Sequence, residues 1–249
     1  MELVRSGVEV FAREAEAWGL TPGPALTIAL APVMAALAFI AAVPFPRWFL
    51  WLIDEDSLLE TLQFVLILAA AVLLARLSAT LFRGGRGGMG TLYLLATLGA
   101  VFVAGEEISW GQRIFGWSTP EALETLNAQQ EISVHNIHGL HGPFIYAVML
   151  SGMYGTVLPI LALTLPPERR RSPAAYLLLP PLCLVPAFFM PFGYRLCRLV
   201  LRPELYVAPG YRVFVITEFN ELTEVCLYFG LLVFVWLNLR RLRPGATAA

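Results

Sequence analysis

Long apolar runs alternate with short polar segments along the chain, and six of these runs reach the length of a membrane-spanning helix. About 20 residues of α-helix cross the hydrocarbon core of a bilayer. Backbone groups in lipid must be hydrogen-bonded internally, so only helices and closed barrels span it, and barrels are built from short alternating segments. The runs here are continuous and rich in Leu and Ala, which predicts helices. We expect spans at about residues 25–43, 58–79, 90–110, 142–163, 174–193 and 213–239.

The composition agrees with a membrane protein and gives no sign of a separate soluble domain. Hydrophobic residues make up 58% of the chain and charged residues 14%, with a mean hydropathy of +0.70, whereas an average soluble domain carries about 25% charged residues. The net charge of −1 offers no basic surface for nucleic acid. We therefore predict an all-α, polytopic transmembrane helical bundle that forms a single integral membrane domain over residues 1–249. We expect the protein to contact the lipid bilayer and not nucleic acid. The pattern does not indicate an oligomeric state or a partner protein.

Two segments outside the spans are expected at the membrane surfaces. Residues 1–20 mix charged and apolar positions without the short apolar core of a signal peptide, which is typical of an amphipathic helix lying on the bilayer. Residues 111–141 form a predicted outer-face loop. Within it, a hydroxyl cap at Ser118, the early Pro120 and the following Glu121 indicate a short helix ending near Asn127.

The arginines predict the orientation, because the chain has no lysine and cytoplasmic loops carry an excess of positive residues. One side of the predicted bundle carries Arg5, Arg13, Arg76, Arg83, Arg86, Arg169, Arg170, Arg171, Arg240, Arg241 and Arg243. The other side carries Arg47, Arg113, Arg195, Arg198, Arg202 and Arg212. The larger group predicts that both termini are cytoplasmic. With this topology, most acidic residues and all 3 histidines fall near the outer face.

Two adjacent carboxylates, Glu106 and Glu107, lie near the end of the third predicted span. A helix C-terminus disfavours anions, so the pair favours a functional role, with one carboxyl protonated or a cation held between the two. The alternative is that both acids simply lie at the water boundary, one of them paired with Arg113.

The sixth predicted span carries a polar stripe on an otherwise apolar helix. The stripe consists of Thr217, Asn220, Glu221, Glu224 and Tyr228. A charge inside the membrane costs at least about 2.5 kcal/mol on insertion scales. Glu221 and Glu224 are therefore expected to face a cavity or a partner, and to act as catalytic carboxylates together with Glu106 and Glu107. The alternative is polar contacts that hold helices together, which more commonly use Ser, Thr, Asn or Gln.

All 3 histidines fall within one short segment and form a candidate metal site. They are His135, His138 and His141. A catalytic zinc typically has three protein ligands and one bound water, so these side chains predict a divalent metal such as zinc. The alternative is a polar loop that happens to contain histidines, since the spacing matches no established zinc signature.

An arginine stripe follows the proline-rich fifth predicted span. It consists of Arg195, Arg198 and Arg202, which recur at helical spacing. As substrate-binding residues, these arginines would hold an anionic head group or phosphate. The alternative, that they neutralise the carboxylates opposite, is at least as well supported.

The stretch from Gly105 to Arg113 reads GEEISWGQR, and it continues through Asn127 to His135 and Asn136. This stretch resembles a family of uncharacterised bacterial multi-pass inner-membrane proteins. The resemblance implies a location in the bacterial cytoplasmic (inner) membrane. It brings no known activity with it.

Together these features predict an outward-facing polar cavity at one end of the bundle. Its expected lining is Glu60, Glu106, Glu107, His135, His138, His141, Glu221 and Glu224. The first hypothesis is a metal-dependent hydrolase or transferase that acts on a lipid or an anionic lipid-linked substrate, with a Glu as general base. The second is a proton- or cation-coupled transporter that uses the intramembrane glutamates. The third is a non-catalytic subunit of a membrane complex.

Overall fold

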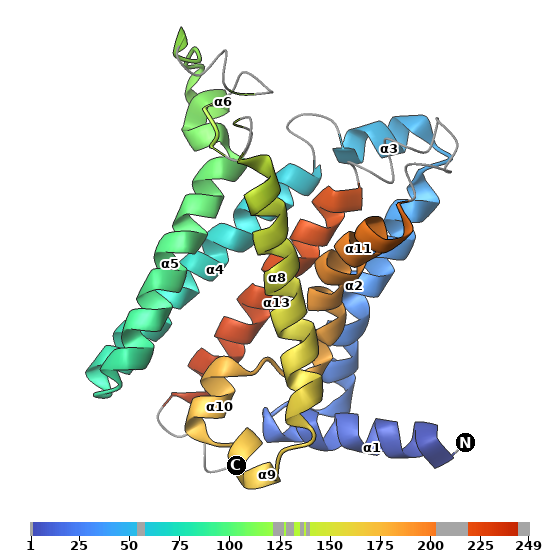
Figure 1. Cartoon of the computed structure of the whole chain (residues 1–249), viewed down its shortest axis with the longest axis vertical. Coiled ribbons are helices and arrows are strands. Elements are labelled where there is room, and N and C mark those ends of the chain that lie inside the picture. The colour runs from blue at the N-terminus through green and yellow to red at the C-terminus, as the bar shows by residue number, and fades with distance from the viewer. Residues whose placement is uncertain are drawn as a thin grey trace.

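The computed structural model describes residues 2–53, 58–121, 127, 132–134, 137, 140–202 and 219–243. Within these residues, six helical segments are long and apolar enough to cross a membrane, and the prediction of an all-α polytopic bundle is confirmed. Figure 1 shows the arrangement of the helices. The spans are α2 (Pro22–Ala42), α4 (Leu58–Arg83), α5 (Gly87–Glu107), α8 (His141–Ala162), α10 (Pro173–Leu178) continued by α11 (Val185–Leu201), and α13 (Phe219–Arg241).

The fifth span differs most from its prediction. It is broken between α10 and α11, where Pro180 and Pro181 lack the backbone N–H that a continuous helix needs, and a short 3₁₀ turn, η2 (Leu182–Leu184), joins the two halves. The predicted end at residue 193 is wrong, because α11 continues to Leu201. No helix breaker stands between these positions. Arg195 and Arg198 therefore lie on the span itself and not in a following loop.

Short helices flank the spans. The predicted N-terminal helix is present as α1 (Glu2–Ala17), which lies across one end of the bundle (Figure 1). Three short α-helices among the described residues were not predicted, namely α3 (Pro46–Ile53), α6 (Gln112–Phe115) and α9 (Pro167–Arg170). Residues 122–126 of the helix expected between Ser118 and Asn127 lie outside the described residues. Asn127 itself forms an isolated antiparallel bridge with Ile137.

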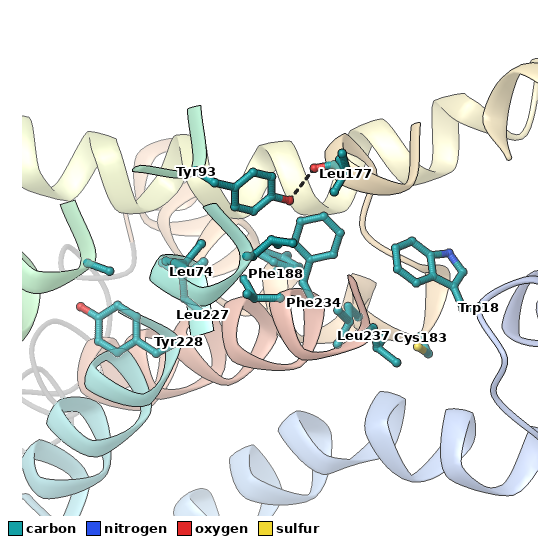
Figure 2. Packing of buried hydrophobic residues seen from close by; sticks show 14 of the residues in the cluster. Trp18, Leu74, Tyr93, Leu177, Cys183, Phe188, Leu227, Tyr228, Phe234 and Leu237 are labelled. Carbon is teal, nitrogen blue, oxygen red and sulfur yellow. Dashed lines mark hydrogen bonds between the residues drawn. The ribbon is translucent and has the colours of Figure 1, made fainter. Parts of the chain in front are cut away.

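The last span in chain order, α13, lies in the middle of the bundle and packs against α4 and α11. Gly230 permits the close approach to α11, because a methyl group there would lie 3.2 Å from the side chains of Ala187 and Phe188. Buried apolar side chains of α13, including Leu227, Phe234 and Leu237, meet those of the neighbouring helices in the core (Figure 2).

The outer surface of the spans is strongly apolar. On α5, for example, Leu95 is 61% exposed and Leu98 is 59% exposed. A row of exposed leucines is costly in water but is the ordinary surface of a helix in lipid, where packing and polar contacts hold the helices together. The exposed leucines and the lengths of the apolar helices both indicate a multi-pass membrane protein.

The helices α4 and α5 form a tight antiparallel hairpin. Its turn closes at Gly85, whose φ of +70° is the left-handed conformation that glycine adopts readily. Ser78 donates a hydrogen bond of 2.8 Å to the carbonyl oxygen of Gly90, and an added methyl at Gly90 would lie 2.9 Å from the ring of Phe82. Tyr93 of the same hairpin donates to the carbonyl oxygen of Leu177 at 2.7 Å, which joins α5 to α10 (Figure 2).

The two ends of the bundle carry opposite chemistry. The end formed by α1, α9, α10 and the last turn of α13 is called the basic end below, because Arg170, Arg171, Arg240 and Arg241 lie there. Arg241 stacks 3.4 Å above the ring of Tyr176 and donates to the carbonyl oxygen of Ala17 at 2.6 Å, so it joins α13 to α1 and α10. The opposite end is called the acidic end.

Candidate functional site

The polar stripe of α13 begins with Glu221, which faces α4 at the acidic end. Gln63 of α4 donates its amide Nε2 to both the carbonyl oxygen and the carboxylate Oε2 of Glu221, each at 2.9 Å. Gln63 is only 1% exposed, so this bond is made out of reach of water. One amide group therefore fixes the side chain of Glu221 against α4.

One turn of α13 joins α11 to a second carboxylate. Arg195 of α11 donates to the side-chain oxygen of Asn220, and Asn220 in turn donates its amide Nδ2 to Oε1 of Glu224 at 2.8 Å. Arg195 is a buried cation, with 8% of its surface exposed. A buried charge needs hydrogen-bonded partners, and Arg195 obtains one through Asn220.

The stripe ends at Tyr228, which bridges α13 to the end of α5. Its hydroxyl donates to Oε1 of Glu107 at 2.8 Å. Tyr228 is buried, whereas Glu107 is half-buried. The three bonded pairs that join different helices thus bring side chains from α4, α5, α11 and α13 to the same end of the bundle. We call this set the acidic-end network: Gln63, Glu107, Arg195, Asn220, Glu221, Glu224 and Tyr228.

Carboxylates outnumber cations in this network. Glu107 lies within electrostatic range of Glu224, Glu221 and Glu60. Arg195 offsets part of this charge, since it interacts with both Glu224 and Glu221. In addition, Oε1 of the buried Gln63 has no hydrogen-bond partner among the described residues. The buried Nε of Arg195 likewise has no hydrogen-bond partner among the described residues. Within this set, three carboxylates face one guanidinium, and such an excess of negative charge favours an added proton or cation.

Glu106 turns away from this network and holds the outer segment instead. Its two carboxylate oxygens accept hydrogen bonds from the indole N–H of Trp110 and, at 2.7 Å, from the backbone N–H of Val134. Glu106 and Glu107 are adjacent on a helix and point about 100° apart, so the structure does not bring them together as a pair.

The backbone after α5 is strained where Glu106 binds Trp110. Ser109 and Trp110 have φ angles of +47° and +54°, a region that non-glycine residues rarely adopt. The ring of Trp110 folds back onto Gly105, where an added methyl would lie 2.9 Å from it. Gly105, Glu106 and Trp110 thus contact one another where α5 ends.

The arginine stripe divides into two roles. Arg195 is bonded inside the network, to the amide oxygen of Asn220. Arg198 lies 5.9 Å from the centre of the Tyr194 ring, and Arg202 ends α11 as an exposed residue with a φ of +45°. Tyr194, which also packs 5.4 Å from the ring of Phe219, was missed by the sequence reasoning. Its position directly before Arg195 on the helix was the available signal.

Most of the predicted metal site lies outside the described residues. This holds for His135 and His138, and His141 is the first residue of α8. Thr217 of the predicted stripe also lies outside them. Where the structure does describe the chain, it contains no group of three or more His, Cys, Asp or Glu residues that could hold a metal ion. The metal site thus stays a prediction.

The chain matches no protein-family model, and it has no significant match among curated proteins or solved structures. The resemblance to bacterial inner-membrane proteins therefore stays a prediction as well. The chemistry of the acidic-end network has to be argued from its own geometry.

Proposed function

We propose that the acidic-end network binds a proton or a small cation, and that the protein is a proton- or cation-coupled transporter that uses this site. One observation carries the proposal. The network combines an unpartnered buried oxygen on Gln63 with the carboxylates of Glu107, Glu221 and Glu224, against the buried cation of Arg195. Charged carboxylates near the membrane interior are stabilised by a bound cation or by protonation.

The hydrogen bonds suggest how the site changes when it binds a proton. Tyr228 and Asn220 donate to Glu107 and Glu224 when these carboxyl groups are ionised. Protonation of either group adds a donor, and the unpartnered oxygen of Gln63 is an acceptor in the same network. Because the network joins four helices, such a change in one carboxyl alters contacts between spans. Coupling of a bound proton to movement of the helices requires this kind of link.

The orientation forms part of the proposal. If the arginine-rich basic end faces the cytoplasm of a bacterium, in agreement with the positive-inside rule, the acidic-end network faces the outer side of the cytoplasmic membrane. A proton or cation that enters from outside then meets the network first.

Flux measurements on the purified protein test this proposal. Liposomes that contain the protein and a trapped pH-sensitive dye receive a gradient of Na⁺, K⁺ or methylammonium in turn, and the internal pH is followed. We expect one of these gradients to move protons in the wild type. Glu224→Gln and Glu107→Gln should reduce that movement to the rate of protein-free liposomes, since each removes an ionisable group. Proton movement that is absent from the wild type under all three gradients would overturn the proposal.

A matched control separates this effect from a general loss of charge. Glu121→Gln removes a carboxylate from the exposed outer segment, outside the network, and should retain the wild-type rate. Equal losses in Glu121→Gln and Glu224→Gln would contradict a specific role for the network.

A metal-dependent hydrolase that acts on a lipid is the second candidate. The bond from Val134 to Glu106 favours it, because this bond ties the outer segment to the end of α5 at the residue that directly precedes His135 in the sequence. A zinc bound in a one-to-one ratio, lost when His135, His138 and His141 are changed to Ala, would support this candidate. Metal analysis of protein purified without chelators tests this candidate. A metal-free wild type would overturn the hydrolase candidate.

A further inference from the structure

Three arginines surround a cavity at the basic end, where α1 meets the segment that follows α8. The cavity has a volume of about 310 Å³, which falls within the range of about 300–1,000 Å³ that is typical of small-molecule sites. Its lining consists of Val10, Arg13 and Glu14 from α1, together with Pro167, Arg170 and Arg171.

The charges of this lining are unbalanced. Glu14 accepts hydrogen bonds at one oxygen, Oε1, from the Nη2 groups of both Arg170 and Arg171, each at 2.9 Å. Arg13 is exposed and donates to the backbone oxygen of Glu9 at 3.3 Å. The lining thus carries three guanidinium groups and one carboxylate. The hydrogen bond to Glu14 raises the pKa of the Arg171 guanidinium above its ordinary value, so this group stays charged at physiological pH.

Two guanidinium donors also lack an acceptor. The Nε atoms of Arg170 and Arg171 are buried and have no hydrogen-bond partner among the described residues. Arg170 uses its Nη1 to hold the carbonyl oxygens of Leu163 and Leu165 at the end of α8. Arg170, Arg171 and Glu14 all line the larger cavity, and Arg170 and Glu14 also border a smaller cavity of about 30 Å³. Guanidinium groups of this kind bind phosphate oxygens through paired hydrogen bonds.

We infer that this cavity binds the phosphate group of an anionic phospholipid. The position of the cavity favours a lipid, because α1 lies across the end of the bundle as a surface helix would lie on a bilayer (Figure 1). A cavity between such a helix and the end of a span lies at the level of the lipid head groups. Basic pockets at that level on the cytoplasmic side are the known type of site for acidic lipids.

Thermal unfolding of the full chain in detergent tests this inference. Phosphatidylglycerol, phosphatidylcholine and inorganic phosphate are each titrated, and the apparent affinity is taken from the rise in Tm with ligand concentration. We expect phosphatidylglycerol to stabilise the wild type at lower concentration than phosphatidylcholine. Arg171→Gln and Arg13→Gln should each weaken the apparent affinity about fivefold.

Arg169→Gln is the matched control. Arg169 is exposed and adjacent to the cavity in sequence but does not line it, so this variant should keep the wild-type affinity. Arg13→Gln keeps the test informative if Arg171→Gln fails to fold, because Arg13 donates to a backbone oxygen within its own helix.

Three results would overturn the inference: equal stabilisation by phosphatidylcholine, no stabilisation by any of the ligands, or the same loss of affinity in Arg169→Gln. Stabilisation by inorganic phosphate as strong as that by phosphatidylglycerol would assign the cavity to a soluble phosphate compound and overturn the lipid assignment.

Discussion

The hydroxyl of Tyr228 reaches from α13 to the carboxylate of Glu107 on α5, from a side chain that is only 6% exposed. Single polar atoms of this kind define the acidic-end network, because each of its links consists of one or two hydrogen bonds. Gln63 contributes an amide to one link, and Asn220 contributes an amide to another. The removal of one atom therefore tests one link at a time.

Tyr228→Phe removes the donor and retains the ring. Hydrogen bonds between membrane helices contribute about 0.6 kcal/mol on average and up to about 1.7 kcal/mol, and a buried acceptor left unpaired costs about 1–3 kcal/mol. We expect the free energy of unfolding to fall by about 1–2 kcal/mol, measured by reversible denaturation in mixed micelles. A double-mutant cycle with Glu107→Gln checks the cause. Additive losses in the cycle would show that the two side chains are not coupled.

At the scale of helices, the contact between α8 and α11 depends on glycines. An added methyl at Gly155 would lie 2.1 Å from the ring of Phe188, and one at Gly152 would lie 2.7 Å from a backbone oxygen of α11. Small residues allow membrane helices to pack closely, and packing replaces the hydrophobic effect as the main source of association in lipid. The position of α11, and with it that of Arg195, therefore depends on the surface of α8.

Gly155→Ala should lower Tm, because α11 must move away from α8. The same movement should weaken the hydrogen bond from Arg195 of α11 to Asn220 of α13. Overpacking of this kind costs about 1–3 kcal/mol. Gly99→Ala on α5 is the control, since a methyl there has no atom within 4 Å and alanine favours the helix. The decisive measurement is thermal unfolding of both variants. A Tm for Gly155→Ala equal to that of Gly99→Ala would contradict the packing described.

The helices and their polar faces could be predicted from the sequence, but their partners could not. The spacing from Asn220 to Tyr228 needs only the helical period, which is a local property. The bond from Arg195 to Asn220 depends on which helices pack together. The leucines of each span do not show which other spans are its neighbours. For Glu106 and Glu107, the sequence shows two adjacent charges, whereas the direction of each side chain depends on the turn that follows the helix.

At the scale of the whole molecule, both described ends of the chain lie at the basic end. The six spans and the bond from Arg241 to Ala17 agree with this arrangement. The bundle is therefore polarised, with a phosphate-binding cavity proposed at one end and a proton- or cation-binding network proposed at the other.

Reporter fusions test the orientation of this polarised bundle. Green fluorescent protein fused to either terminus should fluoresce, because the arginine distribution predicts cytoplasmic termini. Alkaline phosphatase inserted after Glu121 should be active, since this segment lies at the acidic end, whereas the same enzyme inserted at Gly85 should be inactive. The reverse pattern would place the acidic-end network in the cytoplasm and contradict the proposed entry of cations from outside.

The central position of α13 has a consequence for biosynthesis. Among the described spans, α13 is the last to leave the ribosome, although α4 and α11 both pack against it. Until it enters the bilayer, Gln63 and Glu107 lack the partners that α13 supplies. The earlier spans must therefore remain beside the insertion machinery with these polar groups uncovered until α13 has been translated.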